Sequence, residues 1–448
     1  MARGALAALI IQRMRRRLER YFEFERLQTN WKTEMLAGAT TFVTMAYIVF
    51  VNPSVLQEAH MPFKAVVAAT CLCAAFGSIL MGVLARYPIA LAPGMGLNAY
   101  FTYTVVKGMG IPWETALGAV FLSGAAFMIL TLLGIRQLVV EAIPTELFAA
   151  VSAGIGLFIA MIGLRNAGII AASPETLVTI GNLRDKNTVL AVFGLLVTAV
   201  LLAWGVRAAV LLGILLTTLA GALSGLVSWS PETYRFSDIA ATAGKLDVRA
   251  ASHLGLLEVV FVFLFVDFFD NVGTLVGVGK KAGLFDEANR IPRIRRILLS
   301  DAAATIFGSL AGTSTVVSYI ESATGVVAGG RSGVTAIVTG LLFILTLFVA
   351  PLVGAVPAAA TAPALIVVGS LMMSHIGEIR WSDPAVAIPA FLTLVTIPLT
   401  FSIANGLAFG FTAYALLRLL RGRFRETHWL VYVLAALFIA RFVYLGKD

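Results

Sequence analysis

The amino-acid sequence predicts an all-α polytopic membrane protein with about 14 transmembrane helices, since each helical crossing needs roughly 20 apolar residues. Apolar residues make up 59% of the 448 positions and charged residues only 13%, about half the ~25% usual in a soluble domain. The mean hydropathy is +0.92. The apolar runs are long and continuous and do not alternate, which excludes a strand barrel. Two short spans, the third and the tenth, are interrupted, one by proline and glycine and the other by glycines among Ser and Thr.

This composition excludes a soluble enzyme, a nucleic-acid binder and a disordered chain. The formal net charge is +9, and in a membrane protein an excess of Lys and Arg first indicates cytoplasmic loops. Cys71 and Cys73 lie two residues apart in an apolar run, so they predict no disulfide. The four histidines form no HExxH pattern, and no metal site is expected. No GxxxxGKS element is present, which argues against ATP hydrolysis.

The spans follow one another along the whole chain. The candidates are 36–56, 65–84, 89–106, 113–134, 147–164, 188–205, 207–227, 254–279, 298–311, 314–328, 332–351, 359–376, 384–400 and 402–420. A further apolar segment, 428–445, follows the basic run RLLRGRFRETH, and it either spans the membrane or lies on its surface.

The charges orient these spans. Residues 1–35 contain RMRRRLER and predict a basic cytoplasmic arm, not a cleavable signal peptide. If this arm is inside, the inner loops carry most of the cations of the chain. They contain Arg86, Arg136, Arg207, the segment 280–296, Arg331, Arg380 and the segment 417–424. The sequence therefore predicts a multi-pass protein of the cell membrane (a bacterial inner or plasma membrane) with a cytoplasmic N-terminus.

Two spans are unlike plain membrane anchors. The third, 89–106, contains Pro93-Gly94-Met95-Gly96 near its middle, and the tenth, within 312–330, combines four glycines with many Ser and Thr. Paired interrupted segments at corresponding positions of two halves are typical of an inverted-repeat transporter with its site at the midplane. Irregular backbone at that depth must line a cavity or be buried in protein.

Three carboxyl groups within the spans are the most informative. Asp267 and Asp270 are in FLFVDFFDNVGTLVGVG, about 60° apart on one helix face, and Thr274 stacks on the face of Asp270. Glu321 lies in the broken tenth span. A charged carboxylate at the bilayer centre costs about 2.5–3.5 kcal/mol. It persists when it faces a wet cavity, pairs with a cation or binds a proton. The structural alternative, a salt bridge, is weakened because these spans contain few Lys or Arg.

Other polar and aromatic residues have two interpretations each. Asn98, just after the PGMG sequence, either points its amide into a cavity or caps a half-helix. Thr41 and Thr44 on the first span can bond back to the helix, as membrane threonines often do. Tyr47 and Phe76 are candidate aromatic walls, although aromatic residues in spans mostly serve packing.

Four motifs resemble the AzgA-like purine permeases, a branch of the nucleobase–cation symporters. They are ERLQTNWKTEMLAGATTFVTMAYIVFVNPSVL, ALAPGMGLNAYF, FVDFFDNVGTLVGV and SYIESATGVVAGGRSG. The likeness runs over roughly residues 24–420, and the motifs fall in order at the expected spans.

The resemblance implies two inverted repeats of seven spans, folded into a core and a gate domain. After the arm 1–35, the core then comprises 36–134 and 254–351, and the gate comprises 147–227 and 359–420. The segment 428–445 is additional. Spans three and ten are each expected to be broken by a short extended stretch. Related permeases are often homodimers that associate through the gate domain.

The resemblance also implies a site. Related permeases bind the purine base with an acid on span eight and a second acid or amide on span ten. On this chain those positions are Asp270 and Glu321. Backbone groups of the broken stretches contribute contacts around Leu97–Ala99 and Ile320–Ala323. The candidate substrate-binding residues are therefore Asp270, Glu321, Leu97, Asn98, Ala99, Ile320, Ser322, Ala323 and Thr44. Asp270 and Glu321 are also the candidates for proton coupling, while Asp267, Thr274 and Thr41 are supporting residues.

The predicted function is uptake of hypoxanthine, guanine, adenine or xanthine by proton symport, without a cofactor. A purine presents N–H donors and ring acceptors, which suit carboxylates and exposed backbone groups. One alternative is a carrier of the same architecture for sulfate- or bicarbonate-like anions, but an anion site favours half-helix N-termini and a cation. A second alternative is an intramembrane enzyme with Asp267 and Asp270 as an acid dyad. Such dyads normally come from two helices, so the sequence does not predict an enzyme. A third alternative is a channel.

Overall fold

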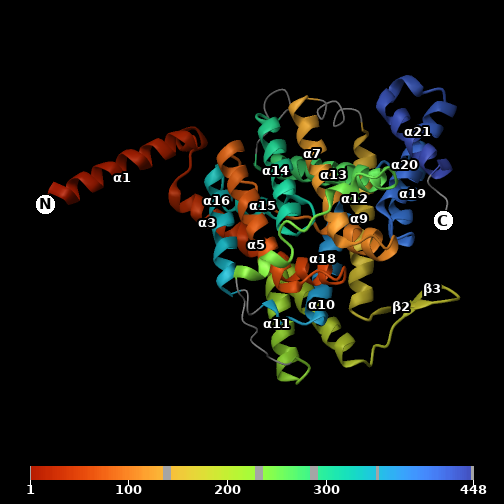
Figure 1. Cartoon of the computed structure of the whole chain (residues 1–448), viewed down its shortest axis with the longest axis horizontal. Coiled ribbons are helices and arrows are strands. Elements are labelled where there is room, and N and C mark those ends of the chain that lie inside the picture. The colour runs from red at the N-terminus through yellow and green to blue at the C-terminus, as the bar shows by residue number, and fades with distance from the viewer. Residues whose placement is uncertain (1, 135–142, 228–235, 283–290, 350–352, 445–448) are drawn as a thin grey trace.

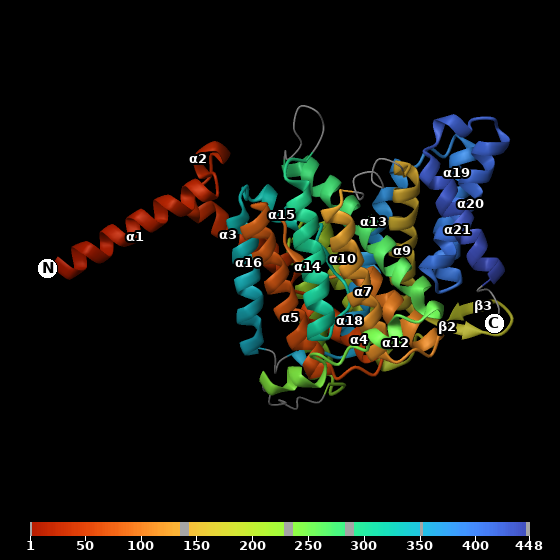
Figure 2. The same ribbon diagram turned by 45° about the horizontal axis from the view of Figure 1, so that its top comes forward.

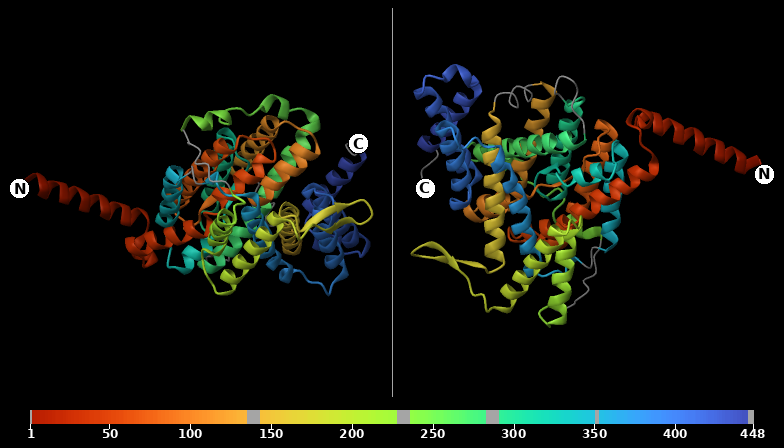
Figure 3. Two further views of the ribbon diagram at one scale, coloured as in Figure 1. Left: turned by 90° about the horizontal axis from the view of Figure 1, so that it is seen from below. Right: turned by 180° about the vertical axis from the view of Figure 1, so that it is seen from behind.

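The computed structural model describes residues 2–134, 143–227, 236–282, 291–349 and 353–444. Within these residues the chain is a bundle of helices that carries two small pairs of strands (Figure 1). The N-terminal helix and the C-terminal helix lie at opposite ends of the long axis (Figures 1 and 3).

The first half of the chain begins outside the bundle and then crosses it repeatedly. Its elements are α1 (Ala2–Tyr21), α2 (Phe24–Leu27), α3 (Trp31–Met45), α4 (Ile48–Gln57), α5 (Phe63–Leu80), η1 (Met81–Ala85), β1 (Leu91–Pro93), α6 (Met95–Ala99), η2 (Tyr100–Gly108), α7 (Trp113–Leu132), α9 (Thr145–Asn166), β2 (Ile170–Ser173), β3 (Leu177–Ile180), α10 (Lys186–Ala203) and α11 (Ala209–Leu223). The segments η1 and η2 are π-helical.

The second half repeats the pattern of long helices with one broken segment. Its elements are η3 (Phe236–Ala241), α12 (Val248–Ala251), η4 (Leu254–Leu256), α13 (Leu257–Ala282), α14 (Ile294–Ala311), β4 (Val316–Ser318), α15 (Ser322–Val327), α16 (Gly333–Thr346), η5 (Leu347–Val349), α18 (Ala358–Met372), η6 (Met373–Glu378), α19 (Pro384–Leu399), α20 (Ile403–Leu420), η7 (Phe424–Glu426) and α21 (Trp429–Tyr444).

The helices pack in two groups. In the first group, α5 and α14 pack against each other, α16 packs on α5 and α3, and α7 packs on α14 and α13. In the second group, α9 packs on α18 and α19, while α10 packs on α11 and α18. Figure 2 shows α16, α5 and α14 on the side of the bundle toward α1, and α9 on the side toward α19 and α20. The contacts of α13, α6 and α4 with α9 and α18 join the groups.

The two broken segments meet inside the first group. Strand β1 pairs antiparallel with β4, in the register Leu91 with Ser318, Ala92 with Val317 and Pro93 with Val316. Two further backbone bonds extend the pairing, from the Gly94 N–H to the Thr315 carbonyl and from the Tyr319 N–H to the Ala90 carbonyl, both 2.9 Å long. Every residue of both strands is buried.

Local sequence explains why helices stop at these two places. Pro88 and Pro93 bracket the first break, and proline removes a backbone donor and disfavours helix in the residue before it. Before the second break, Gly312 ends α14 with a φ of +103°, a conformation that glycine adopts without strain. The β-branched residues Thr315, Val316 and Val317 follow and favour an extended chain.

Hydroxyl groups on neighbouring helices complete the hydrogen bonding of both strands. Ser78 on α5 accepts from the Leu91 N–H at 2.9 Å and donates to the Leu91 carbonyl at 3.1 Å. Thr305 on α14 does the same for Val316, at 3.2 and 3.0 Å. Because water is excluded there, such partners are what allows extended backbone in the interior of a membrane protein. The two halves therefore use the same device.

The observed elements follow the predicted spans with a few differences. Helix α3 begins at Trp31, earlier than expected, because Asn30 caps it by accepting from the Thr33 N–H at 3.0 Å. The segment 165–187 contains the hairpin β2–β3, which the sequence analysis does not predict. The C-terminal segment forms α21, which packs on α20.

The lengths of the helices fit a multi-pass protein. Among the described residues, 7 helices are long and apolar enough to cross a membrane, and four shorter apolar helices accompany them. The interrupted segments add to these.

Candidate functional site

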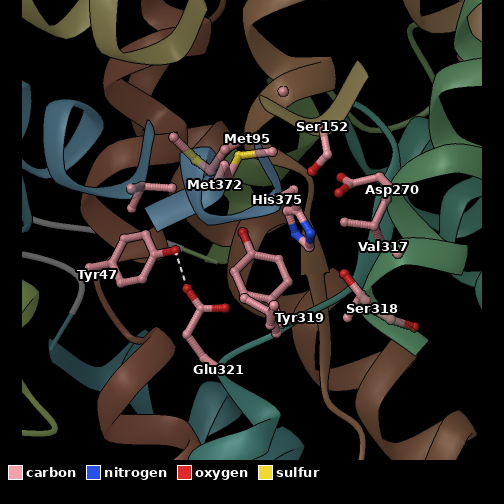
Figure 4. Close-up of a pocket in the computed structure, with 15 residues that line it drawn as sticks. Tyr47, Met95, Ser152, Asp270, Val317, Ser318, Tyr319, Glu321, Met372 and His375 are labelled. Atoms are coloured by element: carbon pink, nitrogen blue, oxygen red, sulfur yellow. Dashed lines mark hydrogen bonds between the residues drawn. The ribbon is translucent and has the colours of Figure 1, made fainter. Parts of the chain in front are cut away.

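One cavity in the described part of the chain lies where the broken segments meet the second group of helices. Its empty volume is about 590 Å³, counting the space at its mouth. Figure 4 draws the lining residues as sticks. The lining residues are Tyr47, Met95, Gly96, Ser152, Asp270, Gly273, Thr274, Val317, Ser318, Tyr319, Ile320, Glu321, Val368, Met372 and His375.

Both predicted acids reach this cavity, from different elements. Asp270 projects from α13, and Glu321 stands between β4 and the first turn of α15. In Figure 4 they lie on opposite sides of the cavity, with Tyr319 and His375 drawn between them. The described residues that line the cavity include no Lys or Arg. Its ionisable side chains are thus two carboxyl groups, two tyrosines and one histidine.

Two tyrosines fix the shape of the cavity around Glu321. Tyr47, in the short link between α3 and α4, donates a hydrogen bond from its hydroxyl to Glu321 Oε1 at 2.6 Å. Tyr319 donates its hydroxyl to the Pro93 carbonyl at 2.5 Å, so its ring bridges from the second broken segment to the first. Both side chains are buried, and both present an aromatic wall.

The second group of helices closes the other side of the cavity. Ser152 comes from α9, Val368 and Met372 come from α18, and His375 comes from η6. The Nδ1 atom of His375 lies 3.2 Å from Glu378 Oε1. The cavity is therefore an interface between the two packing groups.

The first broken segment contributes Met95 and Gly96, not the three residues that follow. Leu97, Asn98 and Ala99 are buried in the protein. The Asn98 amide donates to Asn52 Oδ1 and accepts from the Ser314 hydroxyl, and Asn52 in turn donates to Thr70 at 2.7 Å and Thr313 at 3.0 Å. The side chain of Asn98 thus belongs to a buried polar network beside the strands.

The other predicted residues divide between the cavity and its support. Ile320 and Thr274 line the cavity. Ser322 accepts from the Ala90 N–H at 3.0 Å, and Ala323 is buried in an apolar cluster with Leu91 and Val316. Thr44 bonds to Thr324 at 3.0 Å and Thr41 packs against Gly325, so both hold α15 against α3. Phe76 stacks on Phe307.

Asp267 faces the protein interior behind Asp270. The Asn271 amide donates to Asp267 Oδ1 at 3.3 Å and to Asp301 Oδ2 at 2.6 Å. The side-chain oxygen of Asn271 accepts a hydrogen bond from the Ser318 N–H at 3.1 Å. Asp267 is therefore one bonded residue away from β4, whereas Asp270, three residues further along α13, lines the cavity.

Sequence reasoning missed several lining residues for identifiable reasons. Met95 and Gly96 are in the motif that marks the break, and Tyr319 precedes Glu321 by two positions, so these could have been included. Ser152, Val368 and Met372 lie on apolar spans that carry no local signal. His375 was set aside because its nearest histidine in the sequence is far away.

A cavity between packed apolar helices, with two broken helices at its edge, is typical of a multi-pass membrane transporter. Two solved structures share the fold. The transmembrane domain of a cyanobacterium bicarbonate transporter, BicA, superposes with a TM-score of 0.64 at 14% identity over 83% of this chain and 96% of that one. The structure of SLC26A9 superposes with a TM-score of 0.64 at 11% identity, over 91% of this chain and 69% of SLC26A9. The predicted fold class is confirmed.

The chain belongs to the Permease family, whose pattern matches residues 32–441. It is 52% identical over 96% of its length to "Putative permease MJ0326" of Methanocaldococcus jannaschii, of which it covers 99%. It is 46% identical to the guanine/hypoxanthine permease PbuG of Bacillus subtilis over 96% of this chain and 100% of PbuG. It is 45% identical to the adenine permease AdeP of Escherichia coli over 96% of this chain and 96% of AdeP. The protein is a permease and not an enzyme, as the sequence predicts.

Proposed function

We propose that this permease imports a purine nucleobase together with a proton, and that the base binds between Asp270 and Glu321. The observation that carries the proposal is the convergence of these two carboxyl groups on one cavity between the two helix groups. The names of two relatives support it, since PbuG is a guanine/hypoxanthine permease and AdeP an adenine permease. Hypoxanthine, guanine, adenine and xanthine are the candidate substrates.

The chemistry of the cavity suits a flat, neutral, hydrogen-bonding ring. Carboxylate oxygens accept hydrogen bonds from the N–H groups of a purine. The rings of Tyr47 and Tyr319 and the side chains of Met95 and Met372 provide apolar surface. Backbone groups at Gly96, in the first turn of α6, and at Ile320, two residues after β4, contribute further polar contacts. Leu97, Asn98, Ala99, Ser322, Ala323, Thr44, Thr41 and Asp267 then act by holding these groups in place.

Proton coupling follows from placing two like charges in one cavity. Two ionised carboxylates repel each other and lose hydration, so a proton bound by either of them reduces the electrostatic cost. A base that forms stronger hydrogen bonds with one protonation state of the two carboxyl groups than with the other is thermodynamically linked to that proton. We assign the linked proton to the pair Asp270 and Glu321.

The two packing groups correspond in this proposal to a core and a gate. The core (36–134 and 254–351) carries Asp270 and Glu321, and the gate (147–227 and 359–420) carries Ser152, Met372 and His375. Movement of one rigid group against the other around a fixed site, by an elevator or a rocking motion, would expose the cavity alternately to each side. We place the N-terminus in the cytoplasm because of the charge pattern, and we expect homodimers through the gate.

A bicarbonate-like anion is the second candidate, because BicA is a bicarbonate transporter by title and a structure of the murine Slc26a9 anion transporter superposes on this chain with a TM-score of 0.63. Their identity to this chain of 14% and 12% supports the shared fold and not a shared substrate. An anion would have to enter a cavity whose described lining contains two carboxyl groups and no Lys or Arg. The charge of the cavity therefore favours the neutral base.

Uptake of radiolabelled hypoxanthine, guanine and adenine in cells that lack their own purine carriers tests the proposal. We expect saturable uptake that a protonophore abolishes and that persists without sodium. Asp270→Asn and Glu321→Gln should each reduce uptake about tenfold to hundredfold, since a hydrogen bond to a charged group contributes roughly 1.5–3 kcal/mol. The matched control is Glu175→Gln in the exposed turn of the β2–β3 hairpin, which should transport normally.

Three outcomes would contradict the proposal. Uptake at wild-type rates in both acid variants would show that the site lies elsewhere. Competition by bicarbonate or sulfate but not by purines would favour the anion carrier. Absence of uptake of every base under an inward proton gradient, with the protein present in the membrane, would reject the function itself.

A further inference from the structure

The N-terminal helix α1 stands apart from the bundle. Figure 2 shows α1 running away from the bundle, at a large angle to the upright helices α5, α14 and α16. Its contacts with the rest of the described chain are confined to its last turns and the short helix α2. A helix that leaves a membrane bundle sideways near one end has the direction of a helix lying along the membrane surface.

The exposed part of α1 has two chemically different faces. Met14, Leu18 and Tyr21 recur at the i, i+4, i+7 spacing that places them on one side of a helix, and they are 56%, 39% and 40% exposed. Four arginines, Arg13, Arg16, Arg17 and Arg20, occupy the flank and the opposite side. Within the described residues these four arginines have no carboxylate partner, whereas Arg15 and Arg26 pair with Glu19 and Glu23.

The junction between α1 and the bundle is fixed by directed contacts. Glu19 Oε1 accepts from Arg15 Nε at 2.9 Å and from Trp31 Nε1 at 2.8 Å. These hydrogen bonds, that of Arg15 first, lower the pKa of Glu19 below its usual value, so it remains ionised. Tyr21 donates its hydroxyl to the Val83 carbonyl at 2.7 Å, and the Arg86 guanidinium lies 4.2 Å from the centre of its ring.

A second anchor at the junction is Glu23. Its Oε1 atom lies 3.2 Å from Arg86 Nη1 and 3.2 Å from Arg293 Nη1. The arm is therefore attached to the ends of two different spanning segments. These attachments set the direction in which α1 leaves the bundle, so the helix is held in place before any partner binds it.

We propose that α1 is an in-plane membrane helix that binds a surface of anionic phospholipid. Its apolar side at Met14 and Leu18 enters the boundary between headgroups and acyl chains, Tyr21 holds the end of this side against the bundle, and its arginines bind the phosphates of anionic lipids. An amphipathic helix with Arg on the polar side and apolar residues on the other lies in this way at the interface. Each unpaired cation near an anionic surface adds attraction. The charge of the arm is complementary to this partner.

The full-length protein in lipid nanodiscs tests this inference. Cys71 and Cys73 are completely buried, so a label can be directed to a single new cysteine and the unmodified protein measures the background. Leu18→Cys carries an environment-sensitive dye on the apolar side, and Arg16→Cys carries it on the opposite side as the matched position. The nanodiscs contain phosphatidylcholine alone or with phosphatidylglycerol.

We expect the dye at Leu18 to shift to shorter wavelength with phosphatidylglycerol and to resist a water-soluble quencher, while the dye at Arg16 stays open to that quencher. The shift should weaken at 1 M salt, where the screening length falls to about 3 Å. Replacing Arg13, Arg16, Arg17 and Arg20 together by Gln should abolish it. The control Arg184→Gln with Lys186→Gln, two exposed cations on the far side of the chain, should leave it unchanged.

Two results would overturn the inference. Equal quenching of the dye at Leu18 and at Arg16 in both lipid mixtures would show that α1 does not lie on the membrane. Protection of Leu18 in detergent without lipid, dependent on protein concentration, would show that a second copy of the chain covers the helix. Neither result depends on which substrate the permease carries.

Discussion

The two broken segments share a backbone design but present different side chains to the cavity. Each has one short strand, the strands pair with each other, and Ser78 and Thr305 complete their hydrogen bonds in the same way. Yet the first segment contributes little more than Met95 and Gly96 to the cavity, whereas the second contributes Ser318, Tyr319, Ile320 and Glu321. A duplicated backbone thus supports an asymmetric site.

The difference lies in which residue follows the strand. After β1 the chain has Asn98, whose amide bonds to Asn52 and Ser314 inside the protein. After β4 it has Glu321, whose carboxyl faces the cavity and accepts from Tyr47. The first segment therefore holds the fold together, and the second carries the chemistry that we propose for the site. Three predictions test this division.

The largest effect is expected at Asn98. Asn98→Ala removes the amide that joins Asn52 to Ser314, and each buried polar group left without a partner costs about 1–3 kcal/mol. We expect a clearly lower melting temperature in detergent, measured by thermal unfolding. The exposed Asn187→Ala on α10 is the control and should melt like the wild type.

The same variant can also break the comparison. If Asn98→Ala melts like the wild type but no longer binds a base, the Asn98 amide acts on the substrate and the first segment is a functional partner of the second. That result would restore the role that the sequence predicts for Asn98 and would contradict the division drawn here.

A smaller effect is expected at Tyr47. Tyr47→Phe keeps the ring and removes the hydroxyl that donates to Glu321 Oε1 at 2.6 Å. A hydrogen bond to a charged group contributes about 1.5–3 kcal/mol, so we expect KM for base uptake to rise about tenfold or more. Measuring the rate of uptake against base concentration tests this. The control is Tyr432→Phe, a half-buried tyrosine of α21 whose hydroxyl donates to the Phe424 carbonyl at 3.3 Å and does not line the cavity.

An unchanged KM in Tyr47→Phe would mean that Glu321 needs no orientation by its neighbour. A lowered melting temperature with an unchanged KM would assign Tyr47 to the fold, as aromatic residues in spans generally are. In either case the second segment would be less specialised than the comparison implies.

Much of the fold could be predicted from the sequence because transfer into lipid depends on composition. Long apolar runs placed the spans, and Pro93, Gly94 and Gly312 marked where helices stop. The pairing of β1 with β4 is a contact between residues more than 200 positions apart, so no local pattern specifies it. The β2–β3 hairpin was not predicted, although Ser173-Pro174 favours a turn, because its two strands have only four residues each and no apolar alternation marks them.

The site residues that could be predicted are of types rarely found in membrane spans, and those that could not be predicted are of types common there. A carboxyl group in a membrane span is costly, so Asp270 and Glu321 were conspicuous. Hydropathy does not show how a helix is rotated about its axis. The residues Ser152, Val368 and Met372 therefore looked like any other residues of apolar spans, and Asn98 could face either the cavity or the interior.

The smallest effect is expected at Gly96, where the first segment touches the second group of helices. A Cβ atom at Gly96 would lie 2.5 Å from Ile155 Cγ2 on α9, and overpacking of this kind costs about 1–3 kcal/mol. If α9 moves against the broken segment during transport, Gly96→Ala should lower the maximal rate of uptake several-fold and change KM less than twofold. Gly354→Ala, where a Cβ would meet nothing within 4 Å, is the control.

The double variant with Ile155→Ala removes the colliding methyl group and should recover much of the rate, because contacting residues couple in such cycles. A rate loss in Gly96→Ala that Ile155→Ala does not reduce would show that Gly96 serves the substrate directly, and the first segment would then share the chemistry of the second.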